Sequence, residues 1–145
     1  MADTAVRRTT MLLLYDDGCG FCRWCVGLVL AWDRRGRLHA VPIESATGEE
    51  LLAGLTLDER FGSWHFVDAV GRLWSGGTAF APLGRVLRGG RVMTMLAELS
   101  PAATERAYRL IADNRGRASR FVPAGWMRRA DQRIRRRSAG EVLET

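Results

Sequence analysis

The chain has 145 residues, of which 47% are apolar, and this composition supports one hydrophobic core in a single domain. Its formal net charge of +6 arises in one segment, because residues 1–114 hold 13 Arg against 13 Asp and Glu, whereas residues 115–137 hold nine Arg against Asp131 alone. This distribution excludes a domain that is basic over its whole surface, and no stretch reaches the ~18 to 20 apolar residues of a membrane span.

The basic residues indicate the kind of genome that encodes the chain, and the N-terminal segment indicates the cellular compartment. All 22 basic residues are Arg, which is typical of a GC-rich bacterial genome. Arg7 and Arg8 precede an apolar run, Met11–Tyr15, but its five residues are fewer than the ~7 to 15 that an export signal needs. We therefore expect a soluble cytoplasmic protein, in which cysteines are normally reduced and no framework of structural disulfides forms.

The first elements are predicted from hydrophobic patterning. Met11–Tyr15 is a continuous apolar run ended by Asp-Asp-Gly, which predicts a buried central strand. Gly20–Asp33 is predicted as a helix that ends at the Arg-Arg-Gly of residues 34–36. Its apolar residues recur at spacings of three and four: Phe21, Trp24, Cys25, Leu28, Val29 and Trp32.

The middle of the chain is predicted to alternate between strands and helices. Leu38–Ile43 is expected as a second strand, and Thr47–Leu55 as a helix with its first residue as N-cap. Ser63–Val70 and Arg72–Ser75 flank Gly71, which predicts an antiparallel hairpin. Strand, helix, strand, helix and hairpin in this order are typical of an α/β fold whose first crossover is a βαβ unit.

The rest of the chain is predicted to be helical. Helices are expected over Thr78–Arg88, Met93–Leu99 and Ala102–Asn114, with one more near Trp126–Arg137. We therefore divide the chain into a domain over residues 10–125, a flexible N-terminus over residues 1–9, and an Arg-rich C-terminal helix or tail over residues 126–145.

Three cysteines lie within seven residues where the first strand ends and the first helix begins. Cys19 is expected at the helix N-terminus, where unpaired backbone N–H groups and the helix dipole favour a thiolate. Cys22 follows one turn later, within reach for a disulfide that is readily reduced again. We predict that Cys19 attacks a substrate disulfide and that Cys22 resolves the mixed disulfide, whereas Cys25 packs as a small apolar residue beside Leu28.

Two carboxylates precede the cysteines. Asp16 directly follows the buried strand, where partial desolvation would let it pass a proton to or from Cys22 during resolution. Asp17 is interpreted as a turn residue. The predicted catalytic set is therefore Cys19, Cys22 and Asp16.

Metal binding is the alternative chemistry for a C-x2-C-x2-C cluster. A closed zinc site needs a fourth ligand, for which His39 and His65 are the remaining candidates, and both fall in predicted strands. An iron-sulfur cluster needs a fourth Cys, and the sequence has three. We therefore expect neither a metal nor another cofactor.

The segment Tyr15–Cys22 resembles the signature of the DCC family of thiol-disulfide oxidoreductases, D-x-x-C-x-x-C, with Asp16, Cys19 and Cys22 in the three named places. The resemblance covers about residues 10–125 and includes Asp33–Leu38, Pro42, the Gly71 hairpin, Ser75–Ala79 and Ala112–Arg115.

This resemblance implies a thioredoxin-like, three-layer α/β fold with a central mixed four-stranded sheet and extra C-terminal helices. It also implies protein-disulfide reductase activity on a disulfide-containing protein or small thiol substrate, with a thiol as electron donor. Thioredoxin-like proteins place a cis-proline before the third strand, whereas Phe61–Trp64 contains no proline here.

The Arg-rich C-terminus offers a binding function as a second alternative. Its Arg side chains are of the kind that neutralises the phosphates of nucleic acid or anionic lipid. Trp126 is the one aromatic residue near them, so the interleaved aromatics of a single-strand platform are missing. We interpret the segment as a solvated helix face or solubilising end, and we expect no membrane span.

Overall fold

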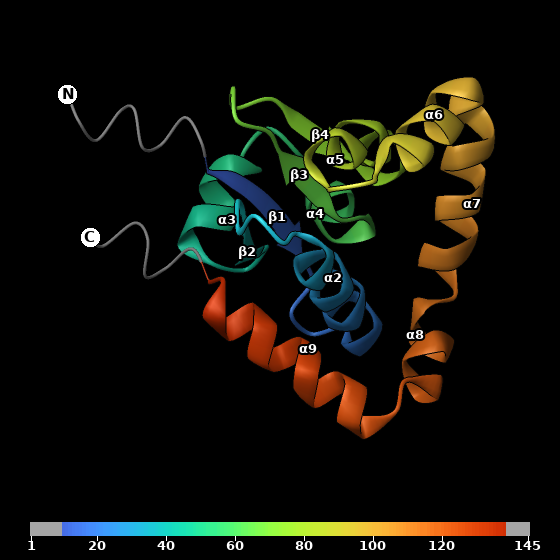
Figure 1. The fold of residues 1–145 in the computed structure, drawn as a ribbon. Helices are drawn as coiled ribbons and strands as arrows, with labels where there is room; N and C mark the ends of the chain where they lie inside the picture. The colour runs from blue at the N-terminus through green and yellow to red at the C-terminus, as the bar shows by residue number, and fades with distance from the viewer. Residues whose placement is uncertain (1–9, 139–145) are drawn as a thin grey trace.

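The computed structural model describes residues 10–138 and is built on a four-stranded sheet in the order β2-β1-β3-β4 (Figure 1). β1 pairs in parallel with β2 and antiparallel with β3, which pairs antiparallel with β4. The strands are β1 (Met11–Tyr15), β2 (Leu38–Pro42), β3 (His65–Val67) and β4 (Leu73–Ser75). The expected flexible N-terminus, residues 1–9, and the last residues of the C-terminal segment, 139–145, lie outside the described residues.

The central strand β1 is buried on both faces, as predicted from its unbroken apolar run. Leu13 and Tyr15 enter one hydrophobic cluster, whereas Leu14 enters a second cluster on the opposite face of the sheet. Successive side chains of a strand point to opposite faces, so each face needs its own cover.

Helices supply that cover on both sides. One layer contains α2 (Gly20–Trp32) and α5 (Phe80–Val86), which contribute Val26, Leu30 and Leu83 to the cluster around Leu13. Between α5 and β4 lies the short 3-10 helix η1 (Gly76–Ala79), and α6 (Arg91–Leu99) follows α5. Opposite them lie α3 (Ala46–Leu51) and α4 (Leu57–Gly62), with Leu52 and Phe61 packed in the cluster around Leu14. The predicted three-layer thioredoxin-like fold is therefore confirmed.

The helix predicted over Thr47–Leu55 is present as α3 but is shorter, because it ends at Leu51, and a second short helix, α4, follows it that was not predicted. Ser45, not Thr47, caps α3: its Oγ accepts a hydrogen bond from the Gly48 backbone N–H at 3.1 Å. α4 starts after Thr56, whose side chain forms a capping box with Glu59. The Thr-x-x-Glu pattern was present in the sequence and indicates this second start.

The predicted hairpin is present, but its first strand is three residues long. Asp68 Oδ1 accepts the backbone N–H groups of Val70 and Arg72 at 3.0 and 2.9 Å. The carboxylate thus takes one of the two hydrogen bonds of the Asp68–Arg72 pair, while the Asp68 N–H still donates to the Arg72 carbonyl at 3.0 Å. Gly71 has φ of +84°, a conformation that favours glycine.

The C-terminal helices leave the sheet and return to it along α2 (Figure 1). They are α7 (Pro101–Asp113), α8 (Arg115–Ala118), the 3-10 helix η2 (Ser119–Phe121) and α9 (Ala124–Arg136). α9 is the helix predicted near residues 126–137, whereas α8 was not predicted. α9 packs so closely on α2 that a Cβ atom built on Gly27 would lie 2.6 Å from the Cβ of Ala130. Ile134 of α9 joins the core cluster of β1 and α2.

Arg137 fixes the end of α9 to the turn between α2 and β2. Its Nη1 lies 3.0 Å from Oδ2 of Asp33, a carboxylate that is 2% exposed and also accepts the Leu38 N–H at 2.8 Å. The Arg137 carbonyl accepts the N–H of Ala40 at 2.8 Å. A buried carboxylate is costly without a partner, so Arg137 has a structural role. No helix among residues 10–138 has the length and apolar character to cross a membrane.

We expect Gly27→Ala to lower the free energy of unfolding by about 1–3 kcal/mol, because the added methyl group forces α9 away from α2. Gly116→Ala is the matched control: no atom lies within 4 Å of a Cβ at that position of α8, so it should be neutral or stabilising by up to about 1 kcal/mol. Urea unfolding of the three proteins measures the difference, and equal stabilities would contradict the close contact.

Candidate active site

The loop between β1 and α2 is fixed by Asp16. Its Oδ1 accepts the N–H of Gly18 at 3.0 Å, and its backbone carbonyl accepts the N–H of Cys19 at 3.2 Å. Cys19 then takes an extended conformation as the N-cap of α2. This tight turn brings the first cysteine to the N-terminus of the helix, as the sequence predicted.

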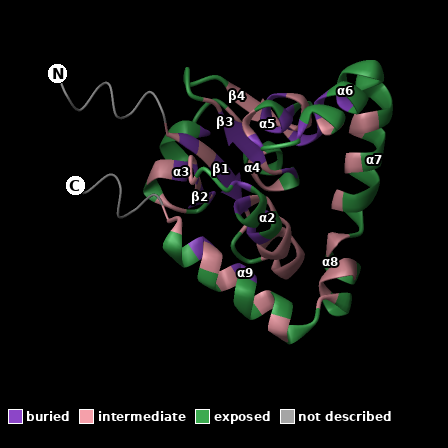
Figure 2. Ribbon diagram, in the orientation of Figure 1, coloured by how far each residue is buried: buried purple, intermediate pink, exposed green. Residues whose placement is uncertain are grey.

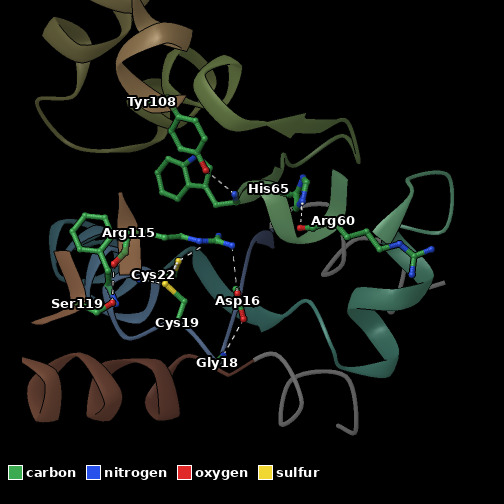
Figure 3. A network of polar contacts seen from close by, with 11 residues as sticks. Asp16, Gly18, Cys19, Cys22, Arg60, His65, Tyr108, Arg115 and Ser119 are labelled. Carbon is green, nitrogen blue, oxygen red and sulfur yellow. Dashed lines mark hydrogen bonds and ion pairs between the residues drawn. The ribbon is translucent and has the colours of Figure 1, made fainter. Parts of the chain in front are cut away.

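The sulfur of Cys19 acts as the capping group of α2 (Figure 3). The backbone N–H of Cys22 donates to Cys19 Sγ at 3.3 Å, and the Cys22 thiol donates to the same sulfur at 2.6 Å. Both cysteines are free and partly buried. Cys19 Sγ thus accepts hydrogen bonds from two donors, and the short separation lets the two sulfurs form a disulfide with little movement.

The two later cysteines lie in a different environment. Burial, followed by the hydrogen bond to Cys19 and the charge of Cys19, raises the pKa of Cys22 to about 12. Burial and the Cys19 charge raise the pKa of Cys25 to about 11. Both groups are therefore neutral thiols at pH 7, and each needs a base before it can act as a nucleophile.

Arg115 of α8 reaches the pair from 93 positions along the chain and is a site residue that the sequence prediction missed (Figure 3). Its Nη1 lies 3.9 Å from Cys22 Sγ, and its Nη2 lies 3.9 Å from Asp16 Oδ2. The guanidinium thus links the Cys22 thiol to the Asp16 carboxylate, and all three predicted site residues meet at one place.

Ser119 holds Arg115 in position. Its hydroxyl donates to the Arg115 carbonyl at 2.9 Å and accepts the N–H of Phe21, in the first turn of α2, at 3.0 Å. The stretch Ala112–Arg115 resembles the DCC pattern, but nothing in its spacing assigns it a place beside Cys22.

Neither histidine supplies a fourth ligand for the cysteines. Both ring nitrogens of His65 are occupied, by Ser75 Oγ at 2.7 Å and by the Arg60 carbonyl at 2.9 Å. His39 lies on β2, where burial and the charge of Arg137 lower its pKa. Among residues 10–138, no group of three or more His, Cys, Asp or Glu side chains is arranged to hold a metal ion.

Comparison with known proteins identifies one family. A family model described as DCC1-like thiol-disulfide oxidoreductase matches residues 13–121, which include Asp16, Cys19, Cys22 and Arg115. The chain is also 31% identical over 107 residues to the uncharacterized protein YuxK of Bacillus subtilis (strain 168), a match that covers 72% of this chain and 77% of that protein. No solved structure matches the chain significantly.

At pH 7 we expect iodoacetamide to label Cys19 before Cys22 and Cys25, because raised pKa values of about 12 and 11 keep the latter two protonated. Labelling of Cys22 and Cys25 should rise about tenfold for each pH unit up to pH 10, without a plateau. Mass spectrometry of the labelled peptides measures this order. In denaturant the three cysteines should react alike, and the same equality in the native protein would contradict the assigned environments.

Proposed function

The chain belongs to the DCC1-like thiol-disulfide oxidoreductase family, and from this premise we propose that it reduces protein disulfides with Cys19 and Cys22 as the exchanging pair. The observation that carries the proposal is the position of two free thiols 2.6 Å apart at the N-terminus of α2. Helix N-termini stabilise thiolates, and a thiolate is the species that attacks a disulfide.

In the first step the Cys19 thiolate attacks one sulfur of the substrate disulfide. The bond between Cys19 Sγ and that sulfur forms, the substrate S–S bond breaks, and the other substrate sulfur leaves as a thiolate that takes a proton from water. The backbone N–H of Cys22 and the Cys22 thiol stabilise the attacking sulfur beforehand.

In the second step Cys22 resolves the mixed disulfide. Cys19 carries no charge in the mixed disulfide, but burial still raises the pKa of Cys22, so a base must first take the proton. We assign this role to the Asp16 carboxylate, acting through a water molecule. Arg115, 3.9 Å from each group, stabilises the Cys22 thiolate as the charge on Asp16 is lost. Cys22 then attacks Cys19 Sγ, the second substrate thiolate leaves, and two electrons have passed from the dithiol to the substrate.

The enzyme disulfide must be reduced again by a second thiol donor. A reductase of this kind works where such a donor is kept reduced, and we place it in the cytoplasm. Cys25 takes no part in the exchange, and neither a metal nor another cofactor enters either step.

We expect Cys22→Ser to trap a mixed disulfide with the substrate, because the attacking thiolate remains while its resolving thiol is gone. Cys19→Ser should abolish disulfide reduction and trap nothing, and Cys25→Ala should retain most of the activity. Non-reducing mass spectrometry with an oxidised protein substrate provides the measurement. An equal loss from all three substitutions would instead favour a ligand cluster over a redox pair.

We expect Asp16→Asn to slow resolution of the mixed disulfide by about 100-fold or more, because the variant lacks the base, while Cys19 alkylation at pH 7 becomes faster because a nearby negative charge is removed. Single-turnover reduction, set beside alkylation kinetics, separates the two steps. Asp17→Asn, one position later, is the matched control and should leave both rates near those of the wild type. Unchanged resolution in Asp16→Asn would remove Asp16 from the mechanism.

A further inference from the structure

A cavity of about 320 Å³ lies beside the cysteine pair, between α2, α5 and α7. Cys22 and Cys25 line it from α2, and Met93 of α6 contributes to the wall. Of the side chains that line the cavity within residues 10–138, two are charged, Asp16 and Arg115, and both belong to the cysteine site. The rest of the wall is almost wholly aromatic and aliphatic.

One wall of the cavity is α7, which stands beside the sheet. Tyr108 Oη accepts the Trp64 backbone N–H at 2.8 Å, and the two rings stack with centroids 6.3 Å apart. Glu105 Oε2 accepts the N–H of Gly77 at 2.9 Å. None of the residues of α7 is buried, and Figure 2 shows the helix exposed or half-exposed along its length. α7 is therefore held in place by its contacts with the segments before β3 and after β4, while the cavity beside it stays open.

The mouth of the cavity exposes apolar surface to water. Leu28 is 47% exposed, Trp32 is 40% exposed and Ile111 is 54% exposed, and all three line the cavity. Covering such a surface with another apolar group is favourable, whereas a charged group would lose its hydration there without gaining a new partner.

We propose that this cavity binds a large apolar side chain, aromatic or branched aliphatic, that lies next to the disulfide of a protein substrate. The inference rests on the proposed function. A substrate sulfur bonded to Cys19 must lie beside Cys22, because the two Sγ atoms are 2.6 Å apart, and Cys22 forms part of the cavity wall. The residue next to the substrate cysteine therefore begins within reach of the cavity.

The size and chemistry of the cavity agree with this occupant. Its volume is at the lower end of the ~300–1,000 Å³ of ligand cavities, which suits one large side chain better than an extended ligand. The side chain contributes binding alone, and the bonds formed and broken are those of the exchange at Cys19 and Cys22.

The test uses two disulfide-linked peptides that are identical except for Phe or Ser next to the cysteine. We expect the wild-type protein to reduce the Phe peptide with a kcat/KM about tenfold higher. Ile111→Gln should lower this ratio to about twofold or less, because an amide replaces apolar wall at the mouth. Leu110→Gln is the matched control: Leu110 is the preceding residue of α7, is 68% exposed and lies outside the cavity, so the ratio should stay near tenfold.

A binding measurement keeps this inference separate from the proposed reductase activity. The same two peptides with methylated cysteines cannot exchange, and calorimetry should show the Phe peptide binding about tenfold more tightly to the wild type and to Leu110→Gln. If neither peptide is reduced but the Phe peptide still binds more tightly, the reductase proposal fails and the cavity assignment stands. Equal binding of the two peptides, or the same preference in Ile111→Gln as in the wild type, overturns the cavity assignment.

Discussion

The first turn of α2 needs hydrogen-bond acceptors for its free backbone N–H groups, and the sulfur of Cys19 accepts the one from Cys22. Helices are usually capped by an oxygen of Ser, Thr, Asp or Asn. With sulfur in this place, the contact that starts the helix also orients the thiol and brings Cys22 next to it. The buried strand β1, the turn at Asp16 and the packing of α2 all serve to hold this one contact.

The features that the sequence predicted correctly are those determined by residues close together along the chain. The bounds of β1, the start of α2 and the position of Cys19 follow from an apolar run, a turn signal and a helical pattern, and all of them are local. The start of α4 was also encoded locally, in the capping box of Thr56 and Glu59, but the sequence prediction assigned no helix between Leu55 and the hairpin.

The remaining features depend on contacts between distant segments. Arg115 joins the site because α7 and Ser119 place α8 against the start of α2, and no sequence spacing reports a contact across 93 positions. In the sequence, the nine Arg of residues 115–137 form one basic segment. In the structure, Arg115 faces a thiol and a carboxylate and Arg137 neutralises a buried carboxylate, whereas Arg128 and Arg129 are exposed. A net charge therefore says little about which Arg side chains are free to bind a partner.

The ion pair between Asp33 and Arg137 joins residues that are 104 positions apart. During synthesis Asp33 leaves the ribosome long before Arg137. Gly27 likewise emerges long before Ala130, the residue against which it packs. Until then the face of α2 that α9 will cover is open to water and the carboxylate has no counter-ion. The nascent chain therefore completes this packing only after Arg137 has emerged, and the thiols of Cys19 and Cys22 are translated before that interval begins.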